Sequence, residues 1–286
     1  MTTSRLSACA VVISLVAAGN AWPAALDWSG AYAGVNAGGG VAHADMRTSV
    51  VPPGSYFEPQ DISQIGDIGP MTSTHGLFTG GAQVGYNLQS GKIVYGLEAD
   101  LNAFEMKGSR SVTQVYNSDP AGSSFVIQQT VRTDWLLTVR PRVGWAVSNF
   151  FIYGTGGLAV TRIKYAARFT DNFNPATPAL ETDSFSKTKA GWTAGAGCEY
   201  ALNDRWSLKG EYLYADFGRI GDDPHLAAPP PNADEFDHTV SLHTHLLRLG
   251  LNFKFYGYEF GLTHSAESTH RKWRYDDPVD APIYSF

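Results

Sequence analysis

Apolar and polar residues alternate along much of the chain. Between Ile93 and Ala103, one set of alternate positions reads Ile, Tyr, Leu, Ala, Leu, Ala, and the other reads Val, Gly, Glu, Asp, Asn. The same contrast recurs over 135–145 and 247–255. Successive side chains of a strand point to opposite faces. Each run therefore predicts a strand with one apolar face and one face of glycine, polar and charged residues.

Eight such strands can be marked, and the lengths of their connections alternate. The predicted strands span 28–42, 76–89, 92–105, 131–147, 150–165, 189–202, 205–218 and 241–255. Tight turns with residues suited to hairpins occur at Ser90-Gly91, Ser148-Asn149 and Asn203-Asp204. The other connections are long, polar and rich in Pro, Gly, Asp and Ser, and they cover 43–75, 106–130, 166–188 and 219–240. This alternation is typical of outer-membrane proteins. We therefore predict an all-β fold, an eight-stranded antiparallel transmembrane β-barrel with long extracellular loops and a short C-terminal extension.

The composition supports a barrel in lipid. Charged residues make up 17% of the 286 residues, against roughly a quarter in ordinary soluble proteins. The mean hydropathy of -0.17 does not suit a helical membrane protein, and the net charge of -6 gives no electrostatic case for nucleic-acid binding. Aromatic residues at predicted strand ends suit interfacial girdles. They are Trp28, Tyr86, Tyr95, Trp135, Trp145, Tyr153, Trp192, Tyr200, Trp206, Tyr212 and Tyr214.

The charged residues of the strands share a face with glycine, which predicts a polar barrel interior. A soluble barrel of the lipocalin type would instead keep its apolar residues inside. The expected interior charges are Glu98, Asp100, Arg140, Arg142, Glu199, Lys209, Glu211, Arg248 and Lys254. Four are acidic and five basic, so the set can nearly neutralise itself. Because an eight-stranded barrel is just wide enough for side chains to fill it, we expect a structural plug of ion pairs. A gated channel or proton path is the alternative.

The two ends of the chain have patterns of their own. Arg5, the apolar run Leu6–Ala18 and the small residues Gly19 and Ala21 predict a signal peptide over 1–21. A barrel over 22–255 and a periplasmic extension over 256–286 follow. Removal of the signal peptide leaves Cys198 as the sole thiol, so no intramolecular disulfide is expected.

The sequence gives little support for a catalytic or metal-binding site. His264, Ser265 and Glu267 are hydrolase residue types, but they lie on a Ser/Thr-rich tail without a rigid scaffold. His243 and His245 share one strand face and suit a metal only with a third ligand, for which His238 is the local candidate. We expect no catalytic, cofactor or metal site.

Several segments resemble the alphaproteobacterial outer-membrane immunogenic proteins, a porin-like opacity group with an OmpA-type barrel of eight strands. The resemblance lies in 27–38, 80–87, 94–100, 153–159, 191–197 and 206–214, in the same order. It implies an antigenic surface protein in the outer membrane of a Gram-negative bacterium, without catalytic residues. This chain departs from the family pattern because it continues for 31 residues past Phe255.

The resemblance also implies that the barrel-assembly machinery reads a last strand that ends in an aromatic residue. Its lipid-facing positions here are Leu247, Leu249, Leu251, Phe253 and Phe255. The other candidate, Phe286, follows Pro282, which cannot donate a ladder hydrogen bond. The internal strand is therefore the expected assembly signal.

The expected function is structural. The barrel supports envelope integrity and displays antigenic loops for surface contact. The alternative is a small-solute channel or a ligand-binding protein, with haemin as an example from the family. Expected partners are outer-membrane lipid and lipopolysaccharide, the assembly machinery and, through the basic residues of the tail, peptidoglycan. A poorly ordered tail without a partner is the other interpretation of residues 256–286.

Overall fold

The computed structural model describes residues 26–51, 56–173, 179–221, 225–226 and 234–255. The predicted signal peptide over 1–21 and the predicted extension over 256–286 lie outside these ranges. Within the ranges, no helix is long and apolar enough to cross a membrane.

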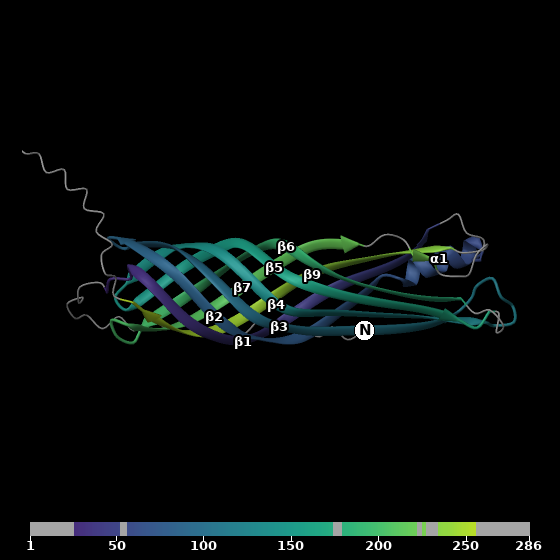
Figure 1. Ribbon diagram of the computed structural model, residues 1–286, viewed down its shortest axis with the longest axis horizontal. Coiled ribbons are helices and arrows are strands. Elements are labelled where there is room, and N and C mark those ends of the chain that lie inside the picture. Colours follow the sequence, from purple (N-terminus) through teal and green to yellow (C-terminus); the bar gives the residue numbers. More distant parts are fainter. Residues whose placement is uncertain (1–25, 52–55, 174–178, 222–224, 227–233, 256–286) are drawn as a thin grey trace, which may run out of the picture. The chain divides into compact units, whose positions relative to one another are not determined.

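Eight long strands in the described ranges form one antiparallel ring (Figure 1). They are β1 (Gly30–Val51), β2 (Met71–Ser90), β3 (Ile93–Val115), β4 (Ser124–Val147), β5 (Phe150–Asp171), β6 (Leu180–Ala201), β7 (Trp206–Gly221) and β9 (Glu235–Lys254). Each pairs with the next long strand, and β1 pairs with β9 to close the ring. The two-residue strand β8 (His225–Leu226) pairs with β9, and the helix α1 (Pro59–Ile68) lies between β1 and β2. The predicted eight-stranded antiparallel barrel is confirmed.

The three predicted tight turns are also confirmed, and they define the turn end of the barrel. Gly91 (φ 61°) and Ser148 (φ 54°) adopt left-handed conformations in two of these turns. In the third, the side-chain oxygen of Asn203 accepts hydrogen bonds from the backbone N–H groups of Arg205 and Trp206, both at 2.9 Å. Asparagine commonly closes a turn in this way.

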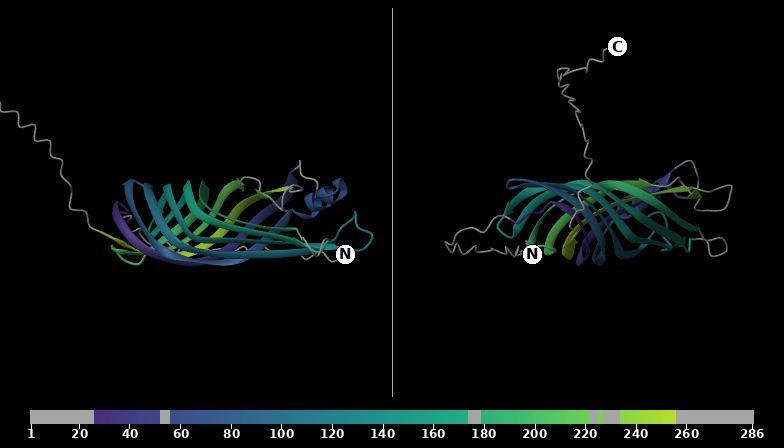
Figure 2. Two further views of the ribbon diagram at one scale, coloured as in Figure 1. Left: turned by 45° about the vertical axis from the view of Figure 1, so that its right-hand side comes forward. Right: turned by 60° about the vertical axis from the view of Figure 1, so that its left-hand side comes forward.

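The strands extend further toward the opposite, loop end than the pattern predicts. β5, expected to stop at residue 165, continues to Asp171, and β6 begins at Leu180 rather than residue 189. β3 and β4 stay paired as far as Val115 and Ser124. The prediction that 43–75, 106–130, 166–188 and 219–240 are loops was therefore wrong over much of their length, because ladder hydrogen bonds continue through them. Figure 2 shows these strand extensions and α1 at the same end of the barrel.

Apolar side chains cover the outside of the barrel near the turn end and fill its inside toward the loop end. Near the turn end, outward residues such as Val143 and Leu249 are 58% and 65% exposed, and we call this part the apolar belt. Toward the loop end, the outward residues of β5 include the exposed Lys164, whereas Ile163 and Phe169 are buried inside. The belt therefore has the pattern of a membrane barrel, and the part beyond it, which we call the loop zone, has that of a soluble barrel.

Candidate functional site

Most of the predicted interior charges meet inside the apolar belt. Eight of the nine form one buried cluster, the lumen network, in which every residue is at most 2% exposed. Its members are Glu98, Asp100, Arg140, Arg142, Glu199, Lys209, Glu211 and Arg248. Lys254 lies instead at the mouth of the turn end, where β9 stops, and its Nζ donates a hydrogen bond to the backbone oxygen of Asp27 at 2.5 Å. Lys254 therefore lies on the lumen side of β9, as expected, and lines the cavity at the mouth, but it is not part of the buried network.

Arg140 occupies the centre of the network. Its guanidinium lies 2.7 Å from a carboxylate oxygen of Glu98, 2.9 Å from Asp100 and 3.2 Å from Glu211. Arg248 bridges two of the same carboxylates, at 2.9 Å from Asp100 and 2.5 Å from Glu211. Two guanidinium groups and three carboxylates thus connect β3 and β4 with β7 and β9 across the lumen through ion pairs.

The remaining pairs extend the network toward the turn end. Lys209 Nζ lies 2.6 Å from Glu98, and the Arg142 guanidinium lies 2.5 Å from Glu199. The network then contains four carboxylates and four cations, and every carboxylate has a cation within 2.9 Å. Buried charges are tolerated when they are paired and hydrogen-bonded in this way.

The strand register brings these partners together. Glu98 on β3 lies opposite Arg140 on β4. Glu211 on β7 lies opposite Arg248 on β9. Glu199 on β6 lies opposite Lys209 on β7, but the Lys209 ammonium contacts Glu98 and Glu211, and Glu199 contacts Arg142. Directly opposite side chains of one sheet face are close enough to interact. The alternation of the sequence predicts the face of each residue, but the pairing of Glu211 with Arg248 also depends on the register between two strands that a long connection separates.

Two tyrosines complete the network because glycines leave room for their rings. Tyr32 donates a hydrogen bond to Glu98 at 2.8 Å, and Tyr153 donates one to Glu211 at 2.9 Å. A Cβ atom on Gly197 would lie 2.4 Å from the Tyr153 hydroxyl oxygen, so only glycine admits the ring there. The assignment of Tyr153 to an interfacial girdle was therefore wrong.

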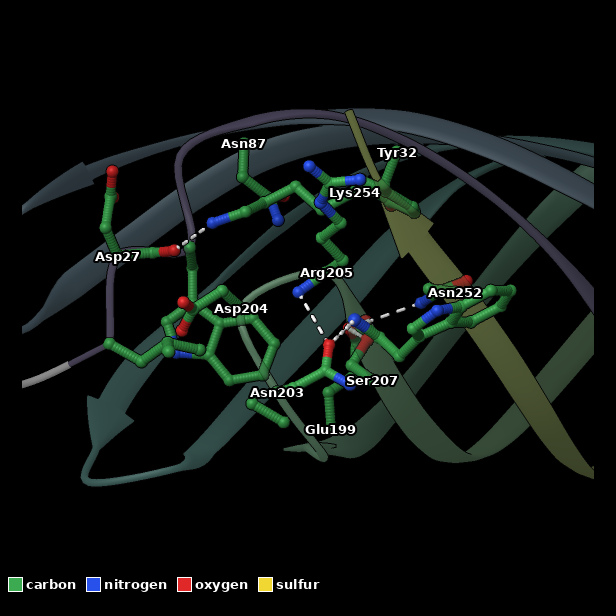
Figure 3. Close-up of a pocket in the computed structure, with 14 residues that line it drawn as sticks. Asp27, Tyr32, Asn87, Glu199, Asn203, Asp204, Arg205, Ser207, Asn252 and Lys254 are labelled. Atoms are coloured by element: carbon green, nitrogen blue, oxygen red, sulfur yellow. Dashed lines mark hydrogen bonds between the residues drawn. The ribbon is translucent and has the colours of Figure 1, made fainter. Parts of the chain in front are cut away.

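Figure 3 shows side chains that line a cavity at the mouth of the turn end, among them Tyr32, Glu199 and Lys254. Trp28 is 5% exposed and packs against Phe151 with ring centroids 5.5 Å apart. It therefore faces inward, and its predicted place in an interfacial girdle was wrong. The cavity that remains there measures about 30 Å³ and is lined by Glu199, Ser207, Lys254 and their neighbours. About one water molecule fits into a space of this size.

The loop zone is closed by apolar side chains that the sequence analysis did not identify. Phe57, Tyr116, Phe125, Phe169 and Phe236 form a buried cluster that we call the aromatic plug. Phe57 stands edge-on to Phe169 and Phe236, with ring centroids 5.6 and 5.9 Å apart. The interior alternation of β5, from Ile163 through Tyr165 to Phe169, is the sequence feature that indicates this cluster.

Hydrogen bonds hold the β1–β2 connection over the plug. The backbone N–H groups of Tyr56 and Phe57 both donate to Asp234 at 3.0 Å. The hydroxyl groups of Tyr56 and Tyr116 donate to Asp171 at 2.9 and 2.8 Å. Burial raises the pKa of Tyr116 far above its usual value, so this phenol remains a hydrogen-bond donor. Among the described residues, the ionic network thus occupies the interior of the belt, and the aromatic plug occupies that of the loop zone.

The histidines divide between the two faces of the barrel. His243 lies on the outer face beside His43 of β1, with ring centroids 5.0 Å apart, and His245 lies on the same face. His238 points inward and is 2% exposed. The idea that His238 is the third ligand of a His243–His245 site was therefore wrong, because an odd separation along a strand places side chains on opposite faces.

The predicted assembly residues lie on the outer face of β9 and just after it. Leu247 and Leu249 are 66% and 65% exposed, Leu251 is 36% exposed and Phe255 is 49% exposed. Phe253 packs against Trp206, with ring centroids 5.0 Å apart. This placement suits contact with lipid, and the role of these residues in assembly stays a prediction.

The chain is similar to known outer-membrane proteins. The model of the outer membrane protein beta-barrel domain matches residues 7–255. The 31 kDa outer-membrane immunogenic protein of Brucella melitensis is 36% identical over 261 residues, which cover 89% of this chain and 95% of the relative. The 22 kDa outer membrane protein of Rhizobium leguminosarum is 32% identical over 164 residues, covering 57% of this chain and 64% of the relative. The solved outer membrane protein OprG of Pseudomonas aeruginosa is 16% identical with a TM-score of 0.41, covering 80% of this chain and 97% of that chain.

These relatives are named as outer-membrane proteins and not as enzymes. The resemblance to the outer-membrane immunogenic proteins is confirmed, and so is the location in the outer membrane of a Gram-negative bacterium. This chain belongs to the family of the outer membrane protein beta-barrel domain.

Proposed function

We propose that the protein is a non-conducting structural barrel, which strengthens the outer membrane and displays its loop zone at the cell surface. The observation that carries this proposal is the filled interior. A permeant ion has to pass Arg140, which is 0% exposed and contacts three carboxylates. It then has to pass the aromatic plug, where Phe125 and Phe236 are also 0% exposed.

The energetics of the lumen network support closure. Displacing Arg140 to open a path leaves buried carboxylates without their partner, and breaking a buried pair costs about 3–5 kcal/mol. The cavity at the mouth, about 30 Å³, is lined in part by Glu199 of this network and has no room for a chain of water molecules. A small-solute channel requires both barriers to move together.

A row of cations outside the barrel supports an attachment to the outer leaflet. Lys107, Arg132 and Lys164 lie directly opposite one another on β3, β4 and β5, and all three are exposed. We call them the basic row. Like charges in directly opposite positions destabilise a sheet, and Asp134 contacts only Lys164 among the three, at 2.7 Å. The basic row lies just beyond the apolar belt, at the level where the phosphate groups of lipopolysaccharide are expected. Each cation near an anionic membrane surface contributes about 1 kcal/mol of attraction.

Deletion of the gene distinguishes a structural barrel from a channel, because the two functions predict opposite changes in the uptake of small solutes. Loss of a structural barrel makes cells more sensitive to detergent and leaves the uptake of small hydrophilic solutes unchanged or higher. Loss of a channel lowers that uptake, and this result would overturn the proposal.

Complementation tests the basic row. The wild-type gene restores detergent resistance, whereas the triple variant Lys107→Gln, Arg132→Gln, Lys164→Gln restores it only partly and co-purifies with less lipopolysaccharide. The control replaces two exposed cations outside the row, Arg47→Gln and Arg219→Gln, and behaves as the wild type. Equal lipopolysaccharide in all three preparations contradicts the attachment.

A further inference from the structure

A second polar cluster lies inside the loop zone, apart from the lumen network. Glu181 and Asp183 of β6 and His238 of β9 are 2%, 5% and 2% exposed. Each offers a ligand atom, and the three atoms all lie within 4.8 Å of one another. Two carboxylates and an imidazole at this spacing need only a small movement to contact one ion.

The hydrogen-bond partners of His238 allow its Nε2 atom to act as a metal ligand. Its Nδ1 lies 2.9 Å from the hydroxyl oxygen of Thr48, which also accepts a hydrogen bond from Gln129 at 2.5 Å. When Nδ1 carries the proton and donates it to Thr48, the lone pair of Nε2 faces Glu181, whose oxygen is 3.2 Å away. Two lone pairs at that separation require a proton or a metal ion between them. A second partner of this kind is the usual means of orienting a metal-binding histidine.

Glu181 gives an independent reason to expect a ligand. Its Oε2 is buried and accepts no hydrogen bond from any residue that the structure describes. A buried carboxylate oxygen without a donor loses its hydration without compensation. Coordination of a metal ion by this carboxylate removes that cost.

We propose that Glu181, Asp183 and His238 form a binding site for a divalent first-row transition metal, with zinc as the best match. Zinc accepts histidine nitrogen together with carboxylate oxygen, and three protein ligands leave a fourth position for water. Such an ion connects β6 to β9 beyond Trp192, where the pairing of β6 with β7 ends in the described residues. The site therefore braces the ring at the point where its backbone ladder is interrupted.

Zinc alone, titrated into the folded full-length protein in detergent, tests the site by calorimetry. The wild type binds one zinc ion per chain, and Co²⁺ in its place gives the visible absorption of a coordinated cobalt ion. Glu181→Gln and His238→Gln each weaken binding by more than the roughly 10–100-fold that the loss of an outer hydrogen-bond partner causes. Thr48→Val, which removes such a partner, falls within that range.

The outer-face histidines provide the matched control. The double variant His243→Ala, His245→Ala keeps the wild-type affinity and the cobalt spectrum. If this double variant loses zinc while Glu181→Gln and His238→Gln retain it, the metal binds on the outer face and the proposal is wrong. Absence of stoichiometric binding by the wild type also overturns it. Unheated gel mobility shows whether each variant is folded, and Thr48→Val keeps the test decisive if a ligand variant fails to fold.

Discussion

Replacement of Arg140 by methionine tests the energetic role of the lumen network. The substitution keeps a side chain of similar length but leaves four carboxylates with three cations. Glu98, Asp100 and Glu211 each lose a contact of 2.7–3.2 Å in a site that excludes solvent. Removal of one partner from a buried ionic cluster typically costs about 3–5 kcal/mol, and we expect Arg140→Met to lower the free energy of unfolding by that amount.

The assay is urea unfolding in detergent micelles, followed by tryptophan fluorescence and by the fraction that keeps its unheated gel mobility. Arg132→Met is the matched control, because Arg132 lies on the same strand with its side chain exposed. Its effect should stay within about 1 kcal/mol.

The double variant Arg140→Met, Glu98→Gln tests charge balance. It restores three carboxylates to three cations, so it should be less destabilised than the sum of its two single variants. A loss of less than about 1 kcal/mol for Arg140→Met, or strict additivity in the double variant, would refute the argument that paired charge stabilises the interior.

Further predictions concern orientation, assembly and packing. In a background without the native thiol, a cysteine replacing Ala121 should react with an impermeant thiol reagent on whole cells, and one replacing Ser90 should not; the reverse pattern overturns the orientation. Truncation after Phe255 should still yield a heat-modifiable barrel in the outer membrane, and degradation of the truncated chain would show that the following residues are needed. Gly197→Ala places a Cβ against the phenol that this glycine admits and should cost about 1–3 kcal/mol, whereas Gly154→Ala, with open space at its Cβ, should cost far less in the same unfolding assay.

The sequence predicts the part of the fold in which the two faces differ most. Within the apolar belt, alternation assigns Glu98 and Arg140 to the interior and Leu249 to the outer face, as the structure has them. The end of β5 was missed because exposed polar residues after position 165, such as Arg168, suggested a loop, although Ala167 and Phe169 continue the alternation inside. The same alternation of residues thus places apolar side chains outside in the apolar belt and inside in the loop zone.

Other features depend on contacts between distant segments. The register shift between Thr133 and Leu136 changes which positions of β4 face inward, and no residue pattern indicates it. The aromatic plug includes Phe57, which lies in a connection outside the strand pattern. His238 meets Glu181 only because the closed ring brings β9 near β6, so a search along the sequence paired it with its near neighbours instead.

Conductance tests the central claim of a filled interior most directly. The purified full-length protein is incorporated into a planar lipid bilayer in concentrated potassium chloride, and its incorporation is verified by unheated gel mobility after recovery. We expect no stable current steps from the wild type, because Arg140 and the aromatic plug close the lumen in series. Reproducible steps whose ion selectivity changes in Lys209→Ala would show that ions pass the network, and would contradict the account.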